Sequence, residues 1–281
     1  MSVNLEAIRK RISVRGYAER GVEESDREGL LAFTRSHAAG PFGNTVRFGL
    51  VEAAEGDFET LKSLGTYAMI RGARTYLAGA VKKAPGNMED FGYCMEGAIL
   101  EATSRGLGTC WLGGTLSRST FGNKLGVAQD EVLPGVTPVG YAAEKRTIKE
   151  RIIRTVIRAS SRKAPKELFF EGDSRIPAAA EKLGKFSEVL EAVRVGPSAS
   201  NKQPWRLIHV AEKNLWHLYI DEDPLYSGAF KDIHIQRVDA GIAMRHLETA
   251  SLELGFPGKW TFQAPAVDAG KWIYIATWLL G

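Results

Sequence analysis

The chain has 281 residues, of which 44% are hydrophobic and 25% charged, and its formal net charge is +4. This composition is ordinary for a soluble globular protein. No apolar run reaches the roughly 18–20 residues that a membrane-spanning helix requires, and the charged N-terminal sequence lacks the apolar stretch of a signal peptide. We therefore expect a cytoplasmic protein without a membrane partner.

The predicted elements alternate between helices and strands. A short helix is expected over 4–11, and the sequence from Ser25 to Glu28 fits a capping box that begins a second helix. Further strands and long helices follow in chain order: a strand over 46–53, a helix over 89–105, strands over 109–113, 136–142 and 205–211, a helix over 236–254, and a strand over 271–279. Each long helix ends at a glycine that suits a left-handed cap, Gly106 or Gly255. The pattern predicts an α+β protein.

The same residues recur at a spacing of 149. The matched pairs are Asp90 and Asp239, Gly92 and Gly241, Met95 and Met244, Gly106 and Gly255, and Trp111 and Trp260. A second match joins "NTVRFGLVEAAE" to "NKQPWRLIHVAE". The alternative is chance similarity between two amphipathic helices. We favour an internal duplication, with halves at 1–150 and 151–281 that mimic a symmetric homodimer.

Positive charge is concentrated between the two halves. Residues 145–166 carry nine Lys or Arg and one Glu, with isoleucines and a valine at helical spacing. This predicts an amphipathic helix with a basic outer face. Such a helix could bind nucleic acid or an anionic surface, or it could be a solvated connector. The absence of interleaved aromatic residues favours the connector, and no nucleic-acid partner is expected.

Cysteine and histidine give no sign of a metal site. Cys94 and Cys110 are the only cysteines, and the five histidines show no metal-ligand spacing. We expect no metal and no disulfide scaffold.

Three motifs carry polar groups that could bind a ligand. Arg11, Ser13 and Arg15 alternate in "RISVR", so an extended segment projects them to one side, where two guanidinium groups suit a phosphate. A solvated surface triplet is the alternative. The proline-framed loop "GPSASNKQPW" presents Ser198, Ser200, Asn201 and Gln203 before an apolar strand, although a plain turn would have a similar composition.

The third motif is "RGLGTCWLGG", in which Gly113 and Gly114 would let the backbone approach a flat ligand closely. It is not a dinucleotide fingerprint, because its glycines follow a helix instead of preceding one. A nearby strand ends in "VGYAAEKR", which supplies Lys145 and Arg146, whereas the corresponding end of the second half carries no charge.

Together, "RxSxR", "PSxSNxQPW", "GLGTCWLGG" and "VGYxAEKR" resemble the nitroreductase family of FMN flavoproteins. "RKAPKELFFEG" further resembles the subgroup in which two nitroreductase-like halves are fused. The resemblance implies a nitroreductase-like fold of two related α/β halves that form an intramolecular pseudo-dimer. It also implies a monomer, because the fused chain has already buried the family's dimer interface.

The resemblance assigns the cofactor-binding residues. One half would supply Arg11, Ser13, Arg15, Thr109, Cys110, Leu112, Gly113, Gly114, Lys145 and Arg146, and the other Pro197, Ser198, Ser200, Asn201 and Gln203. The counterpart segments, "GPFGN", "FPGKW" and the uncharged tail, are inadequate for a second site. We therefore expect one FMN per chain.

The function that the resemblance implies is an FMN-dependent NAD(P)H oxidoreductase. By a ping-pong flavin mechanism it would take electrons from NADH or NADPH and reduce a small-molecule acceptor such as a nitroaromatic or a quinone. The chemistry is centred on the flavin, so no catalytic side chain is assigned. The alternative is a flavin-binding protein of the same fold without turnover.

Overall fold

The computed structural model divides the chain into two compact units, residues 1–159 and 160–281. The residues that it describes are 3–52, 70–113, 118–144, 161–172, 176–179, 183–224, 232–265 and 267–281. Each unit combines helices with a mainly antiparallel sheet, which confirms the predicted α+β class. The predicted division at 150/151 lies outside the described residues, as does most of the predicted connector over 145–166, so both stay predictions.

The sheet of the first unit is built around a strand that is apolar on both faces. Its strands are β1 (Val46–Glu52), β2 (Thr75–Lys82), β3 (Gly108–Thr109), β4 (Glu131–Val132) and β5 (Val136–Gly140). They follow the order β1-β2-β5-β3, with β4 also paired to β2, and the pairings are antiparallel. Every residue of β2 except Lys82 is buried. A strand buried on both faces lacks the alternation that marks a half-exposed strand, which is why β2 was not predicted.

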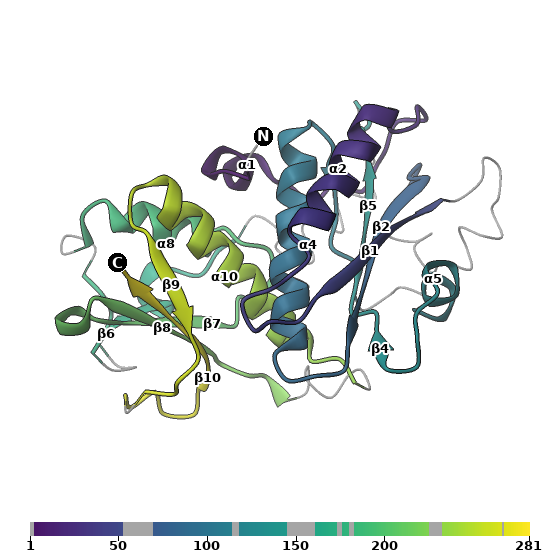
Figure 1. Cartoon of the computed structure of the whole chain (residues 1–281). Helices are drawn as coiled ribbons and strands as arrows, with labels where there is room; N and C mark the ends of the chain where they lie inside the picture. Colours follow the sequence, from purple (N-terminus) through teal and green to yellow (C-terminus); the bar gives the residue numbers. More distant parts are fainter. Residues whose placement is uncertain are drawn as a thin grey trace. The chain divides into compact units, whose positions relative to one another are not determined.

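The helices of the first unit include one that is buried along most of its length. The described helices are α1 (Leu5–Lys10), α2 (Glu24–Ser36), α4 (Asn87–Ser104) and α5 (Arg118–Leu125). Figure 1 shows α2 and α4 side by side on one face of β1 and β2, and both helices contact β1. Residues Met88 to Ala102 of α4 are buried. The helix ends before Gly106, whose φ of 76° confirms the predicted left-handed cap.

The start of α2 differs from the prediction. The capping box at Ser25 and Glu28 is wrong, because the helix begins at Glu24 and encloses both residues. Glu23 occupies the N-cap position and makes no capping hydrogen bond through its side chain. The short helix predicted over 4–11 is confirmed, and the side chain of Asn4 caps it by accepting a 2.9 Å bond from the Ala7 amide.

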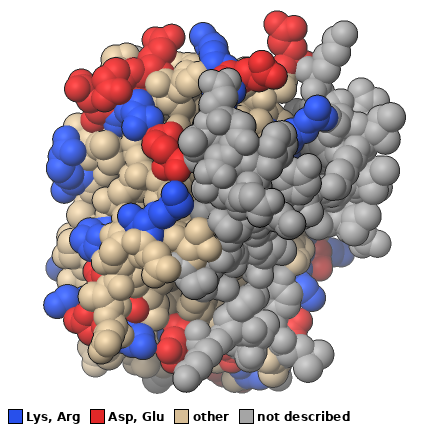
Figure 2. All heavy atoms as spheres, turned by 90° about the vertical axis from the view of Figure 1, so that its right-hand side faces the viewer, with Lys and Arg blue, Asp and Glu red and all other residues tan. Residues whose placement is uncertain are grey.

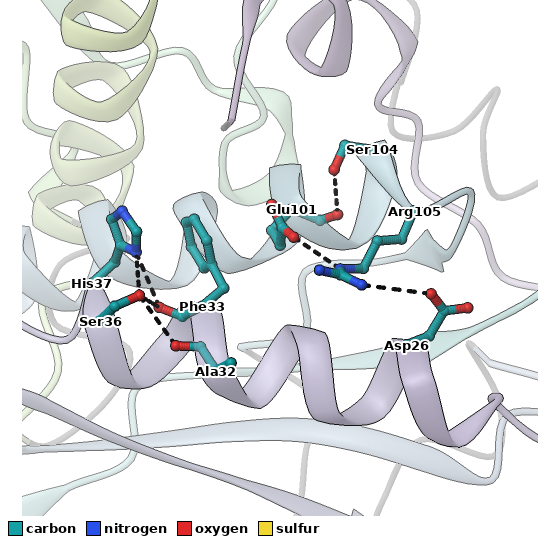
Figure 3. A network of polar contacts seen from close by, with 8 residues as sticks. All are labelled: Asp26, Ala32, Phe33, Ser36, His37, Glu101, Ser104 and Arg105. Carbon is teal, nitrogen blue, oxygen red and sulfur yellow. Dashed lines mark hydrogen bonds and ion pairs between the residues drawn. The ribbon is translucent and has the colours of Figure 1, made fainter. Parts of the chain in front are cut away.

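An ion-pair network fastens α2 to the end of α4 (Figure 3). The Arg105 Nε donates to Glu101 Oε1 at 2.8 Å, and its Nη1 lies 3.8 Å from Asp26 Oδ1. Tyr141 beyond β5 donates its hydroxyl to the other oxygen of Asp26 at 3.0 Å. The network therefore joins two helices to the end of a central strand. At the far end of α2, Ser36 donates to the Ala32 carbonyl, as an ordinary helix-end contact.

The second unit repeats the path of four strands, with the added strand β6 and, among the described residues, no counterpart of β4. Its strands are β6 (Phe169–Glu171), β7 (Trp205–Val210), β8 (Leu215–Ile220), β9 (Gly258–Thr261) and β10 (Ile273–Leu280), in the order β6-β7-β8-β10-β9. Helices α8 (Phe186–Arg194) and α10 (Ile235–Glu253) pack against each other, as Figure 1 shows. The added strand β6 pairs with β7 in parallel, whereas the other pairings are antiparallel. Among the described residues, no helix is long and apolar enough to cross a membrane.

The two units share one topology, as the sequence repeat predicts. The sheet order β1-β2-β5-β3 corresponds strand for strand to β7-β8-β10-β9. Along the chain, the long helix follows β2 and precedes β3 in the first unit, and it follows β8 and precedes β9 in the second. Each unit also anchors a tryptophan to its long helix. Trp111 donates its indole N–H to Glu96 at 2.6 Å, and Trp260 donates to Glu248 at 2.7 Å. Chance similarity between two helices does not account for this agreement.

Candidate functional site

The "RISVR" motif forms an extended segment beside the sheet of the first unit. Ser13 forms a parallel bridge with Thr109, and the Val14 amide donates to the Thr109 carbonyl at 2.8 Å. Three residues further on, the Tyr17 amide donates to the Arg71 carbonyl at 2.9 Å. The segment is therefore held by backbone bonds on both sides, and its side chains have fixed directions.

Both arginines of this motif are buried, so the alternative of a solvated triplet is wrong. Arg11 is 9% exposed and Arg15 is 7% exposed, whereas Ile12 between them is 46% exposed. The Nε and Nη1 atoms of Arg15 have no hydrogen-bond partner among the described residues. A buried guanidinium without acceptors is costly, and a bound anion would supply the acceptors that it lacks.

Arg11 differs from Arg15 because a buried carboxylate balances its charge. Glu96 on α4 is completely buried and places its Oε1 3.7 Å from the Arg11 Nε. Its other oxygen accepts the Trp111 indole N–H. Glu96 therefore links the arginine segment to the glycine-containing strand. Sequence reasoning missed it, although a glutamate inside a buried helix is a signal of a polar partner.

The predicted stretch from Thr109 to Leu112 faces the protein core. Thr109, Cys110 and Leu112 are all less than 5% exposed, and the last two belong to the apolar cluster under the sheet. The Cys110 amide donates to the Thr137 hydroxyl at 3.0 Å. Any ligand contact of this stretch would therefore involve backbone atoms. Gly113 is half-buried, and three predicted site residues lie outside the described residues: Gly114, Lys145 and Arg146.

A glycine makes room for the arginine segment. A Cβ added at Gly108 would lie 2.9 Å from the Cβ of Val14. The glycine lets two backbones approach each other, and the predicted approach of a flat ligand at Gly113 and Gly114 stays a prediction.

In the second unit, the predicted polar loop has an unusual backbone. Ser200, Asn201 and Gln203 have φ values of 47°, 56° and 49°, in the left-handed region that non-glycine residues rarely adopt. Three such residues within four positions store strain, and strain of this kind is concentrated at functional sites. The alternative of a plain turn therefore does not describe this loop.

Hydrogen bonds within the unit fix this conformation. The Gln203 amide donates to the Ser198 hydroxyl at 2.8 Å, and the Gln203 side-chain carbonyl accepts from the Lys163 amide at 2.8 Å. The Asn201 side chain donates to the Ser161 carbonyl at 2.8 Å and accepts from Arg162 at 3.2 Å. Asn201 and Gln203 therefore act first as supports of the loop.

The other predicted residues of the loop differ in their exposure. Pro197 and Ser198 are half-buried, and Ser200 is exposed. Arg162 and Lys163, which brace the loop, were not predicted as site residues. The sequence signal that could have identified them is their position at the start of the "RKAPKELFFEG" segment.

The repeated aspartates hold equivalent loops in the two units. Asp90 accepts bonds of 2.8 Å from the amides of Phe42 and Asn44. Asp239 accepts a 2.9 Å bond from the Ala199 amide through one oxygen, and its Oδ2 has no partner in the described part of the chain. Burial raises the pKa of both carboxyl groups, and that of Asp239 lies well above its usual value.

Comparison with known proteins identifies relatives of the whole chain. A family model described as "Putative TM nitroreductase" matches residues 4–251. The crystal structure of a "putative nitroreductase" from Thermotoga maritima is 18% identical, with a TM-score of 0.61, and the match covers 100% of this chain and 93% of that one. This likeness shows a shared fold.

Other solved structures match about half of the chain. An FMN-dependent nitroreductase from Clostridium difficile is 18% identical, with a TM-score of 0.41, and the match covers 50% of this chain and 88% of that one. A nitroreductase family protein from Clostridium novyi is 16% identical, with a TM-score of 0.41, covering 50% and 84%. The search of curated proteins finds no match.

Proposed function

The chain belongs to the TM nitroreductase family, and on that premise we propose that it is an FMN-dependent oxidoreductase that takes electrons from NADH or NADPH. The observation that carries the proposal is the buried guanidinium of Arg15, which lacks hydrogen-bond acceptors on two nitrogens. The FMN phosphate is an anion with several acceptor oxygens, so its chemistry fits this group.

The described residues fit the flavin in two places. In the first unit, Arg15 and Ser13 would hold the phosphate, with Arg11 beside them. In the second unit, the strained loop would present Ser198 and Ser200 to the polar edge of the ring. The resemblance assigns both sets to a single flavin, and one FMN per chain is part of the proposal.

When bound, FMN would supply the transfer of electrons from the nicotinamide to an acceptor such as a nitroaromatic or a quinone, in the two half-reactions of a ping-pong mechanism. The chain's own residues bind and orient. Arg15 offers positive charge from a rigid, buried position, so little reorganisation is needed when the anion arrives. The loop keeps its hydroxyl groups at fixed positions because Asn201 and Gln203 lock its backbone.

The visible absorbance spectrum tests this proposal first. We expect the purified protein, supplied with FMN, to retain about one equivalent per chain, and this flavin to bleach when NADH or NADPH is added without oxygen. Reoxidation by a quinone would complete the two half-reactions. Arg15→Ala and Ser198→Ala should each reduce the occupancy of the same single equivalent. A protein that cannot be loaded with FMN would contradict the proposal.

A flavoprotein without turnover is the second candidate. It is favoured by the uneven distribution of polar residues, since the loop "GPFGN" of the first unit lacks the serines of its counterpart. It predicts stable FMN that NADH and NADPH do not reduce. Bleaching in the experiment above would exclude it.

Nucleic-acid binding has less support. On the described surface in Figure 2, Lys and Arg side chains are interspersed with Asp and Glu, without a continuous basic patch on that part of the face. The basic residues 145–160 lie outside the described residues. Binding to duplex DNA that weakens as the salt concentration rises would support a nucleic-acid function, because such binding releases counterions.

Substitution of Gly108 tests the support of the arginine segment. In Gly108→Ala the new methyl group would displace Val14 and with it Arg15. We expect a loss of about 1–3 kcal/mol in the free energy of unfolding, measured by urea denaturation, together with weaker FMN binding. The control is Gly106→Ala, which has open space but a positive φ. It should cost about 1 kcal/mol and leave FMN affinity unchanged.

A further inference from the structure

The strained loop of the second unit needs a support from outside itself. Several bonds of residues 198–203 run within the loop or to the extended segment 161–163. The bond from the Ala199 amide to Asp239 Oδ1, at 2.9 Å, instead ties the loop to the long helix α10. Ala199 directly precedes the first left-handed residue, Ser200. This bond therefore fixes the point at which the unusual backbone begins.

The equivalent aspartate of the first unit provides a comparison within the same chain. Asp90 accepts the amides of Phe42 and Asn44 and also the side chain of Asn44, at 2.9 Å. In the second unit, the corresponding Asn201 turns to Ser161 and Arg162 instead. Asp239 thus accepts the Ala199 amide through one oxygen, and its other oxygen has no hydrogen-bond partner in the described part of the chain.

The surroundings of Asp239 favour its neutral acid form. The residue is 2% exposed, and burial raises its pKa. A neutral acid still offers one carbonyl oxygen to the Ala199 amide. The loop can therefore be anchored without burying a charge, and an asparagine would offer the same acceptor with nearly the same shape.

We propose that Asp239 is the positioning residue of the flavin site, and that its bond to the Ala199 amide sets the turn that presents Ser198 and Ser200. This inference rests on the proposed function. Asp90, by contrast, holds a loop without those serines and serves stability alone. Asp239 does not touch the reacting atoms and acts through the loop.

The test compares Asp239→Ala, Asp239→Asn and Asp90→Ala in the full-length protein. FMN binding is measured by the quenching of flavin fluorescence, and stability by thermal unfolding. We expect Asp239→Ala to raise the Kd for FMN at least tenfold, since a buried amide loses its acceptor. Asp239→Asn should bind within about twofold of the wild type, because it keeps the acceptor. Asp90→Ala should lower the Tm without changing the Kd.

A second variant removes the donor instead of the acceptor. Ala199→Pro deletes the amide hydrogen at the first position of a short helical turn, where proline is tolerated. The preceding Ser198 is already extended, with ψ of 160°, as the residue before a proline requires. This variant should show the same rise in Kd as Asp239→Ala. It covers the case in which Asp239→Ala does not fold.

Hydrogen exchange separates a failure of this inference from a failure of the proposed function. In the FMN-free protein, amides of a peptide covering 196–204 should exchange faster in Asp239→Ala than in Asp239→Asn or Asp90→Ala. If the wild type binds FMN and Asp239→Ala binds it equally well, the inference is wrong and the function stands. If no variant binds FMN but the exchange pattern appears, the function is wrong and the anchoring role stands. Unchanged exchange in Asp239→Ala overturns the inference.

Discussion

Replacing Arg15 by methionine is expected to stabilise the FMN-free protein and to abolish tight FMN binding. The guanidinium is 7% exposed, and two of its nitrogens have no hydrogen-bond partner among the described residues. Without a ligand, the folded state therefore carries the cost of a desolvated charge, which an apolar side chain of similar length removes. We expect a gain of about 1–3 kcal/mol in urea denaturation and at least a hundredfold rise in the Kd for FMN.

Arg11→Met is the matched control, and its effect on stability should have the opposite sign. Removing Arg11 leaves the buried carboxylate of Glu96 without the cation that lies 3.7 Å away. Breaking a buried pair on one side costs about 3 kcal/mol. A loss of stability in both variants would contradict the prediction, because it would show that the Arg15 guanidinium stabilises the folded protein even without a bound anion. Inorganic phosphate should stabilise the wild type and Arg11→Met, but not Arg15→Met.

The sequence predicted the parts of the fold that repeat or alternate. The spacing of 149 residues placed both long helices, and their observed starts, Asn87 and Ile235, are within two residues of the predicted ones. Strand β2 was missed because it is buried along nearly its whole length, so it shows no alternation. The added strand β6 has three residues, which is too short for a periodic signal.

For the candidate site, the sequence could not show which side chains support the loop and the arginine segment. The prediction that Asn201 and Gln203 bind the cofactor stays a prediction, and the structure adds that their side-chain amides hold the loop. These bonds join positions about 40 residues apart in the sequence, so a local sequence pattern cannot predict them. The same holds for Glu96, whose partners Arg11 and Trp111 come from separate segments. The burial of Arg15 could not be read from an alternation that also fits an exposed strand.

A buried histidine in the second unit is expected to make the stability of the protein depend strongly on pH. His217 lies on β8 and is 5% exposed. Its Nδ1 is 2.7 Å from the Thr277 hydroxyl, which also contacts the Tyr274 hydroxyl at 2.8 Å. Burial, with a smaller contribution from Lys213, lowers the pKa of His217 to about 4. The folded protein therefore keeps this imidazole neutral at pH values where an unfolded chain would protonate it.

The consequence is a loss of stability in mild acid. As the pH falls below the ordinary value of 6.5, the unfolded state takes up the proton first, and the loss is complete near the folded pKa of about 4. This amounts to about 3 kcal/mol between those values. The raised pKa values of Asp90 and Asp239 act in the opposite direction, because their folded forms bind protons more readily. The prediction therefore concerns the difference in the free energy of unfolding between the wild type and His217→Asn, in which the contributions of Asp90 and Asp239 cancel.

Urea denaturation of both proteins at pH 7 and pH 4.5 measures that difference. His217→Asn should lose stability at pH 7, because packing is altered, but it should recover most of the deficit relative to wild type at pH 4.5. His37→Asn, at an exposed position of the first unit, is the control for replacing a histidine outside this cluster. A direct check is the NMR titration of the imidazole protons, in which the signal missing from His217→Asn should titrate near pH 4. A titration near 6.5 would mean that this imidazole is hydrated, and that the His217–Thr277–Tyr274 cluster opens to solvent instead of forming a closed part of the sheet.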